Sequence, residues 1–372
     1  MVTPVCNRAR PALPGFHGLV KLGSTFPCNP TIPALDLRIG AGWILAKHVL
    51  VTGGAGYIGA HACKVLAAAG YVPVAFDSLA TGWRDAVKFG PFVQGNLLDR
   101  DALDAAFAQY KPLAVMHFAA LALVGDASRD PGQYWRVNVG GSLNLIEAAI
   151  AANVKNFVFS STCAVYGNPD GMHLDEETAQ RPINAYGASK RAIEDMLANF
   201  GESHGLNHVI FRYFNVAGAD PDGEVGEQHK PETHLIPLML ETISGARPKL
   251  TVYGTDYATR DGTCIRDYVH VMDLVEAHVL GLRWLLDGRG NRVFNLGTGR
   301  GFSVREVIDH ARIVTNRAVK VTMGARRAGD AAALVSGSER ARVELGWTPS
   351  RSTLPQMIAD AWGWHQRPGF DG

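Results

Sequence analysis

The sequence of 372 residues predicts an α/β protein with a doubly wound parallel sheet and a smaller second lobe toward the C-terminus. Three observations support this class. Short β-branched runs alternate with helical patterns from residue 47 onward; the first run, at 48–52, enters a glycine-rich turn; and after Gly218 the chain changes to loops rich in Gly, Pro, Asp and Glu. Alternating strands and helices are typical of a parallel sheet with crossover helices on both faces.

The alternation predicts at least six parallel strands, at 48–52, 72–76, 92–93, 113–118, 156–160 and 208–213. Helices are predicted between them, at 57–70, 102–110, 134–152 and 185–204. Residues 1–46 differ from the rest, with six prolines, a single acid at Asp36 and no periodicity, and we predict a disordered extension there.

Composition excludes several classes of partner. The formal charge is only +1, with no basic stripe, so no nucleic acid is expected. No apolar run approaches the roughly 18 residues of a membrane span. Five cysteines lack paired or metal-ligand spacing, which favours reduced thiols in the cytoplasm. The histidines form no His-x-x-x-His pair set on a helix beside a suitable acid, so no catalytic metal is predicted.

The glycine-rich turn has the spacing of a dinucleotide site: Gly53, Gly56 and Gly59 follow the first strand directly. Glycines let the backbone turn sharply and approach a pyrophosphate, while the helix beginning at Tyr57 points its N-terminus at the phosphates. Asp77 ends the next strand, where a carboxylate binds both ribose hydroxyls and repels a 2′-phosphate. NAD is therefore favoured over NADP, although Arg84 lies nearby.

A second constellation lies at the end of the strand 156–160. Thr162 follows that strand, and Tyr186 and Lys190 stand four residues apart at the start of a long predicted helix. This spacing places a phenol and an ammonium on one helical face. Positive charge from Lys190 and an oxidised nicotinamide would bring the phenol pKa toward neutrality, so Tyr186 is predicted to be a general base and Thr162 to share its proton transfer.

Residues 47–366 resemble the extended short-chain dehydrogenase/reductase family, and within it the NAD-dependent epimerases and dehydratases of sugar nucleotides. The resemblance rests on ten motifs in order: Thr52–Gly59, His117–Ala120, Asn138–Gly141, Tyr186–Lys190, Arg212–Gly218, His234–Pro237, Asp261–Asp273, Asn295–Gly297, Arg327–Asp330 and Leu345–Trp347. It implies a Rossmann domain at 47–218 with returning segments near 265–300, and a sugar-nucleotide lobe at 219–264 and 301–366.

The resemblance also implies roles for individual residues. Those expected to bind NAD are Gly53, Gly56, Tyr57, Ile58, Gly59, Asp77, Ser78, Asn96, Leu97, Phe118, Ala119, Ala120, Asn138, Tyr186, Lys190 and Phe214. Those expected to bind substrate are Thr162, Tyr186, Asn215, His234, Leu235, Tyr253, Arg266, Arg327 and Asp330. An ion pair of Arg266 with Asp267 or Asp273 is the alternative for that side chain.

The implied activity is the reversible epimerisation of UDP-glucose and UDP-galactose at carbon 4, through a transient 4-keto sugar and bound NAD. Dehydratases need an acid pair after the catalytic Ser/Thr, where this chain has Cys163 and Ala164, so elimination is not expected. The bulk of Leu334 argues against N-acetylated sugars.

The sequence leaves alternatives for the substrate, for catalysis itself and for the oligomeric state. A UDP-xylose/UDP-arabinose 4-epimerase would use the same machinery, and a non-catalytic NAD-binding sensor could share the fold. The resemblance suggests a homodimer joined through helices 134–152 and 185–204, but Leu143, Ile146, Ile193 and Leu197 could equally be ordinary core.

Overall fold

The computed structural model describes residues 47–371 apart from 170–172, 327–330 and 368, and the prediction of disorder for residues 1–46 lies outside this range. A seven-stranded sheet forms its centre, in the order β11-β7-β5-β4-β1-β2-β3, and all neighbouring strands are parallel. The strands are β1 His48–Thr52, β2 Val72–Asp77, β3 Phe92–Gln94, β4 Ala114–His117, β5 Asn156–Ser160, β7 Asn207–Tyr213 and β11 Arg292–Leu296. The predicted fold class is confirmed.

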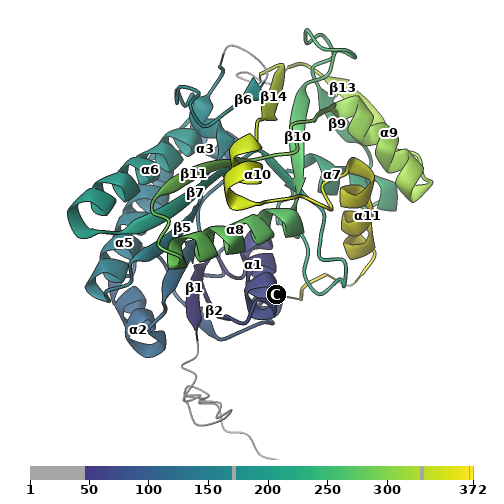
Figure 1. Cartoon of the computed structure of the whole chain (residues 1–372). Coiled ribbons are helices and arrows are strands. Elements are labelled where there is room, and N and C mark those ends of the chain that lie inside the picture. The colour runs from purple at the N-terminus through teal and green to yellow at the C-terminus, as the bar shows by residue number, and fades with distance from the viewer. Residues whose placement is uncertain (1–46, 170–172, 327–330, 368, 372) are drawn as a thin grey trace, which may run out of the picture.

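Helices cover both faces of this sheet (Figure 1). Alternate side chains of β1 point to opposite faces, and each face is apolar. Val49 and Val51 belong to the apolar cluster that includes α1 (Tyr57–Ala68) and α8 (Val271–Leu286). Leu50 points the other way, into the cluster with α2 (Arg100–Tyr110), α5 (Gly141–Ala151) and α6 (Ala185–His204). All three β1 side chains are fully buried, as expected for a central strand of a parallel sheet.

The strand order reverses between β1 and β4, because the chain builds outward to β3 and then returns to the other side of β1. In open parallel sheets, ligands bind beyond the carboxyl ends of the strands at such a reversal. The fold therefore places the turn after β1 at the expected position for a ligand.

The helix predicted at 134–152 begins earlier and is not uniform. Asp130 caps α4 (Pro131–Tyr134) by accepting a hydrogen bond from Gln133 N, and Pro131 occupies the first turn. A π-helical turn at Trp135–Gly140 then leads into α5. The cap and the N1 proline are the signals that should have placed the start at 131.

A second region packs on the carboxyl side of the sheet, at the right in Figure 1. Helices α7 (Leu235–Ser244), α9 (Val304–Thr315) and α11 (Leu354–His365) share one apolar cluster. Strands β9 (Leu250–Tyr253) and β13 (Val321–Gly324) pair in parallel beside them.

The remaining strands connect the two regions. They are β6 His173–Leu174, β8 Asn215–Ala217, β10 Ile265–His270, β12 Gly301–Ser303 and β14 Ala333–Ser336, with β10 paired to β8, β12 and β14. The short helices are η1 Arg84–Ala86, α3 Val124–Arg129, η3 Cys163–Tyr166 and α10 Glu339–Leu345. Strand β8 follows directly on β7 of the main sheet, so its pairing with β10 connects the small sheet to the main one.

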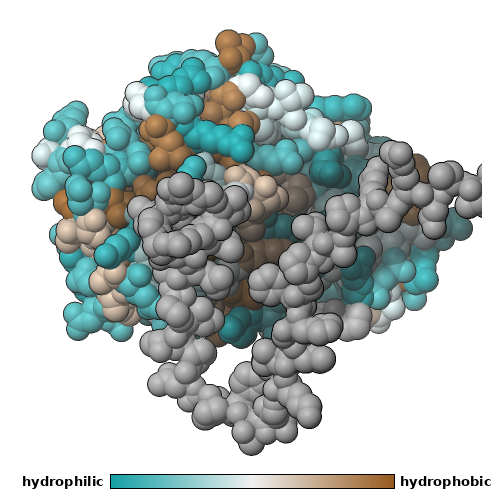
Figure 2. Space-filling view, turned by 60° about the horizontal axis from the view of Figure 1, so that its bottom comes forward, coloured by the Kyte–Doolittle hydropathy of each residue, from teal (hydrophilic) through white to brown (hydrophobic). Residues whose placement is uncertain are grey.

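Among the described helices, none is both long and apolar enough to cross a membrane. Figure 2 shows one face of the molecule, on which hydrophilic residues predominate and hydrophobic ones form separate patches.

Candidate active site

A cavity of about 1010 Å³ runs from the carboxyl edge of the main sheet into the second region. Its walls include nearly all of the residues that the sequence assigned to NAD or substrate. From the cofactor set it is lined by Gly53, Gly56, Tyr57, Ile58, Gly59, Asp77, Ser78, Asn96, Leu97, Phe118, Ala119, Ala120, Tyr186, Lys190 and Phe214. From the substrate set it is lined by Thr162, Tyr186, Asn215, His234, Leu235, Tyr253 and Arg266.

Two of the three predicted dinucleotide-site glycines in the turn after β1 have no room for a Cβ. Gly53 has a φ of +73°, and a Cβ there would lie 2.7 Å from the backbone nitrogen of Ala119. A Cβ on Gly59 would lie 2.0 Å from the carbonyl oxygen of Gly53. The turn is thus packed against the end of β4 and the first turn of α1, and its backbone faces the cavity as a pyrophosphate site requires.

Asp77 lies at the end of β2, beside this turn. Its carboxylate accepts hydrogen bonds from Ala55 N at 3.0 Å and Leu79 N at 2.8 Å. Burial raises the pKa of Asp77, and the backbone N–H groups oppose that shift. Arg84 is the basic residue whose proximity in the sequence counted in favour of NADP. Its guanidinium lies over the ring of Phe92, 4.6 Å from the centroid.

Asn138 is the predicted cofactor residue that does not line the cavity. It is fully buried; its Oδ1 accepts from Leu121 N at 2.8 Å, and its Nδ2 donates to Leu121 O and to Ser189 Oγ, both at 3.0 Å. The structure therefore places Asn138 behind the wall, where it joins the segment after β4 to helix α6. A motif match alone does not show whether a side chain lines the cavity or packs behind the residues that do.

Thr162 and Tyr186 come together at the end of β5. Thr162 caps η3 through a hydrogen bond from Ala164 N, and its side chain also forms a hydrogen bond with Tyr186. Burial raises the pKa of Tyr186 to about 12, and the bond to Thr162 only partly opposes this. The predicted shift of this pKa toward neutrality relied on both Lys190 and an oxidised nicotinamide, and the protein groups without the cofactor do not produce it.

Lys190 is buried one helical turn further along α6. Its Nζ donates to Ser160 O at 2.8 Å and lies 4.8 Å from the centroid of the Phe159 ring. Burial lowers the pKa of Lys190 to about 7, while the charge of Glu194 acts in the opposite direction. Since Lys190 holds its proton weakly, it supplies less positive charge than the sequence interpretation assumed.

A buried ion pair lies behind these residues. Arg212 and Glu194 are each 5% exposed and approach to 2.6 Å, and Ser161 Oγ donates to the same carboxylate at 2.5 Å. Arg212 Nη1 also donates to Tyr166 Oη at 3.0 Å. This network fixes β5, β7 and α6 relative to one another.

The substrate end of the cavity is built from the second region. Asn215 begins β8, Leu235 begins α7, and Arg266 lies on β10 with its Nη1 donating to Ala331 O at 2.9 Å. The alternative partners of Arg266 have other contacts, since Asp267 accepts from Thr298 Oγ1 and Asp273 from Ser352 Oγ. The predicted residues Arg327 and Asp330 lie outside the described residues.

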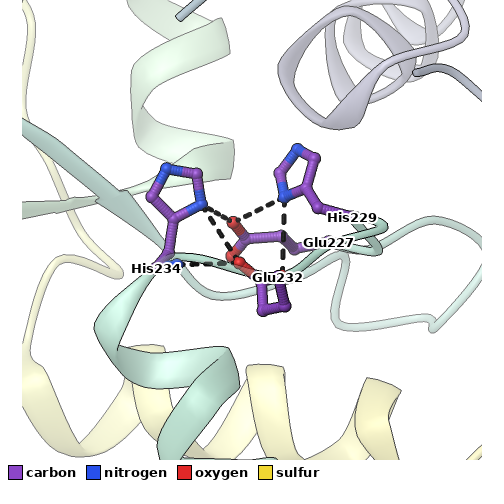
Figure 3. Close-up of side chains that lie close together, drawn as sticks. All are labelled: Glu227, His229, Glu232 and His234. Carbon is purple, nitrogen blue, oxygen red and sulfur yellow. Dashed lines mark hydrogen bonds and ion pairs between the residues drawn. The ribbon is translucent and has the colours of Figure 1, made fainter. Parts of the chain in front are cut away.

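Sequence reasoning missed a charged cluster at this end, formed by Glu227, His229, Glu232 and His234 (Figure 3). Only His234 had been assigned to the site. Burial alone would lower the pKa of each imidazole, but the two carboxylates raise the pKa of both His229 and His234. The sequence contains the signal as two Glu-x-His pairs that begin five residues apart. They lie in a loop, so a search for metal ligands at helical spacing does not find them.

These parts define a class of protein. A glycine turn after the first strand, with Thr, Tyr and Lys at the end of β5 and the start of α6, forms the site of a nicotinamide-dinucleotide enzyme of the short-chain dehydrogenase/reductase type. Residues 49–297 match the model of the NAD dependent epimerase/dehydratase family, and the chain belongs to this family. NAD is accordingly its cofactor, as the sequence predicted.

Relatives and solved structures agree with this assignment. A UDP-glucose 4-epimerase of Rhizobium meliloti (strain 1021) is 48% identical over 326 residues, which cover 88% of this chain and 99% of the relative. A crystal structure of UDP-glucose 4-epimerase from Brucella ovis in complex with NAD is 48% identical, with a TM-score of 0.84 over 86% of this chain and 98% of the other.

A third relative bears on the substrate. The structure of a UDP-glucose 4-epimerase from Stenotrophomonas maltophila, with bound NAD and formylated UDP-arabinopyranose, is 38% identical. Its TM-score is 0.83, over 86% of this chain and 98% of that one.

Proposed function

We propose that this chain catalyses the reversible epimerisation of UDP-glucose and UDP-galactose at carbon 4. One observation carries the proposal: Tyr186, hydrogen-bonded to Thr162, lies on a cavity wall that is continuous with the glycine turn after β1. The similar proteins named UDP-glucose 4-epimerase, at 48% identity over nearly their whole length, support the same substrate.

Tyr186 takes and returns the proton of the 4-hydroxyl group in this proposal, and Thr162 holds that hydroxyl by a second hydrogen bond. Bound NAD supplies a reversible hydride acceptor for carbon 4, so that the sugar passes through a transient 4-keto form. Because burial raises the pKa of Tyr186 to about 12, the phenol becomes basic only where added positive charge lies beside it. The enzyme thus abstracts the proton only when the oxidised cofactor is in place.

Elimination of water would need a proton donor and acceptor at the two positions after Thr162, both of which the structure describes, and neither position supplies one. The Cys163 side chain is 1% exposed and its thiol pKa is raised by burial, and Ala164 has no ionisable group. Epimerisation is therefore preferred over 4,6-dehydration.

The remaining substrate roles are also proposals. Asn215, His234, Leu235 and Tyr253 would hold the sugar and diphosphate, and the Arg266 guanidinium suits the diphosphate oxygens. Arg327 would assist Arg266, and Asp330 would bind the uridine ribose.

The proposed function also leads us to assign the domains, the oligomeric state and the cellular compartment. We assign residues 47–218, with the returning segments near 265–300, to cofactor binding, and 219–264 with 301–366 to the sugar nucleotide. We infer a homodimer in the cytoplasm. For the dimer, Ile146, Ile193 and Leu197 are core residues, so the contact would use exposed neighbours such as Trp135, which is 45% exposed.

A pentose nucleotide is the second candidate substrate, because the similar Stenotrophomonas structure holds a UDP-arabinopyranose derivative. Purified protein is incubated with UDP-galactose or UDP-arabinose without added NAD, and the 4-epimers are separated by chromatography. Faster conversion of UDP-galactose, lost in Tyr186→Phe but kept in Tyr110→Phe, is the expected result. Faster conversion of UDP-arabinose would reassign the substrate.

The same assay tests for a non-catalytic sensor. Protein that carries NAD but converts neither sugar nucleotide, even after NAD is supplied, would overturn the enzyme proposal.

A further inference from the structure

The cluster of two Glu-x-His pairs lies in the loop that precedes α7. Glu227 and His229 form the first pair, Glu232 and His234 the second, and His234 is the residue directly before the helix. In Figure 3 the two imidazoles stand on either side of the two carboxylates, and both direct Nδ1 toward them.

Three of the four distances between an imidazole nitrogen and a carboxylate oxygen in the cluster are close to those between the ligands of a tetrahedral metal centre. Ligands about 2.0 to 2.1 Å from a central ion lie roughly 3.3 Å from one another. His229 Nδ1 lies 3.3 Å from Glu227 Oε1 and 3.5 Å from Glu232 Oε2. His234 Nδ1 lies 3.4 Å from Glu232 Oε1, and only its 2.7 Å separation from Glu227 Oε1 is clearly shorter.

The His229 imidazole gives a second, independent indication. Its Nδ1 is buried and lies at ion-pair distance from both carboxylates, but it makes no hydrogen bond of regular geometry with any described residue. A buried polar atom without a hydrogen bond costs free energy, so it normally has a partner in the functional state. Once an ion displaces the proton of this imidazole, the Nδ1 lone pair would be directed at the carboxylate oxygens, where the ion would sit.

Part of the cluster is also held in place before any ion binds. Glu232 Oε1 accepts hydrogen bonds from the backbone nitrogens of Thr233, at 2.6 Å, and His234, at 2.8 Å. The carboxylates of Glu227 and Glu232 are 8% and 4% exposed, and among the described residues both form ion pairs with the two imidazoles. Bringing two buried carboxylates together is unfavourable unless a cation lies between them.

We propose that Glu227, His229, Glu232 and His234 bind one divalent transition-metal ion of the zinc class. Two imidazole nitrogens and two carboxylate oxygens suit Zn²⁺, whereas Mg²⁺ and Ca²⁺ prefer oxygen ligands alone. Four protein ligands close a tetrahedral site, so the ion acts on structure rather than on the reaction. None of its four ligands is a predicted catalytic residue, and no metal was predicted to take part in catalysis.

The consequence for the enzyme is a cross-link beside the substrate. Glu227, His229 and His234 all line the cavity, and Leu235, the next residue, begins α7. An ion at the cluster would fix the loop to the start of that helix. The ion would also carry the same charge as the two imidazolium protons that it displaces, so the field on the substrate would change little.

The test uses full-length protein, freed of metal with a chelator and then dialysed. Cobalt(II) is titrated in and its visible absorption recorded, because tetrahedral Co²⁺ absorbs much more strongly than octahedral Co²⁺. One equivalent with tetrahedral intensity, displaced by Zn²⁺, is expected. Absence of stoichiometric binding by the wild-type protein would overturn the proposal.

Variants locate the ion. His229→Gln and Glu232→Gln should each weaken cobalt binding at least tenfold, whereas His204→Gln, at the exposed end of α6, should leave it unchanged. Equal binding in all of these proteins would place the ion elsewhere and refute the assignment. Retained NAD serves as the folding check for each variant.

A measurement on the wild-type protein covers the case in which the variants fail to fold. X-ray absorption of the zinc-loaded enzyme should show a nitrogen and oxygen shell with the scattering pattern of two imidazoles. A sulfur shell would instead assign the ion to cysteine and overturn the proposal.

Discussion

The two ends of the cavity are lined by different parts of the chain: mainly backbone at the cofactor end and mainly side chains at the substrate end. At the cofactor end, the backbone forms the wall, and Gly53 and Gly59 are set against their neighbours with no room for a Cβ. At the substrate end, side chains such as Arg266 and His234 reach in from β10 and from the loop before α7. A backbone wall fixes one shape, whereas a side-chain wall can change its specificity by single substitutions.

The largest effect is expected from adding one carbon at the cofactor end. Gly53→Ala combines a φ of +73° with a clash against Ala119, and we expect about 3 kcal/mol of strain, or a roughly 100-fold weaker hold on NAD. NAD released per chain after purification measures the loss.

Gly70→Ala is the matched control. Gly70 has a φ of +85°, but a Cβ there has nothing within 4 Å. The control should lose some stability from the backbone strain and keep its NAD. Equal NAD loss in both variants would show that φ alone, and not the close approach, decides binding.

A smaller, selective effect is expected at the substrate end. Arg266→Lys keeps the charge but loses the planar guanidinium, so we expect KM for UDP-galactose to rise about tenfold, with kcat and NAD content nearly unchanged. Steady-state kinetics measures the change, with Arg260→Lys as the control, since Arg260 pairs with Glu306 away from the cavity. A fall in kcat alone would contradict a binding role.

Between the two ends, Lys190 should make stability depend on pH. Burial lowers its pKa to about 7 in the folded chain, against about 10.4 in an unfolded one. Below pH 7 both states bind the proton; between pH 7 and 10 only the unfolded state does, so this group makes the free energy of unfolding rise with pH. The slope is at most about 1.4 kcal/mol per pH unit.

Urea unfolding at pH 7, 8 and 9 tests this prediction. Lys190→Met should lose the slope, and Lys155→Met, at an exposed position, should retain it. A parallel pH dependence in the wild-type protein and Lys190→Met would show that Lys190 keeps an ordinary pKa.

The smallest effect is expected from a wider substrate end. Leu334 lines the cavity on β14, and Leu334→Ala should give a several-fold gain on UDP-N-acetylgalactosamine, because only a few methyl groups of space are created. The ratio of kcat/KM for the N-acetylated and plain sugars measures it, with Leu238→Ala as a second cavity variant. An equal gain in this ratio for both variants would show that Leu334 does not specifically exclude N-acetylated sugars.

The same contrast explains what the sequence could predict. The cofactor end is encoded in contiguous motifs, where Gly53 to Gly59 and Tyr186 to Lys190 act through neighbours in the chain, and the parallel sheet follows from simple alternation. The buried position of Asn138 could not be predicted, because a motif does not reveal whether a side chain lines a cavity or lies behind its lining.

The substrate end depends on distant pairings that no local pattern contains. Arg266 is brought beside Leu334 by the pairing of β10 with β14. The burial that raises the pKa of Tyr186 comes from the whole fold, so the spacing of Tyr186 and Lys190 in the sequence does not reveal it. The Glu-x-His pairs were visible in the sequence, but only the loop geometry brings their four ligand atoms within 4.8 Å of one another.

The late return of the chain to the main sheet has a consequence for synthesis. Strand β7 ends at Tyr213, and its outer neighbour β11 begins only at Arg292, after α8 has been made. Until then a nascent chain exposes the unpaired edge of β7 and the apolar face on which α8 later packs. A ribosome that stalls between these two strands would therefore release a fragment prone to aggregation, which makes this interval the point of greatest need for a chaperone.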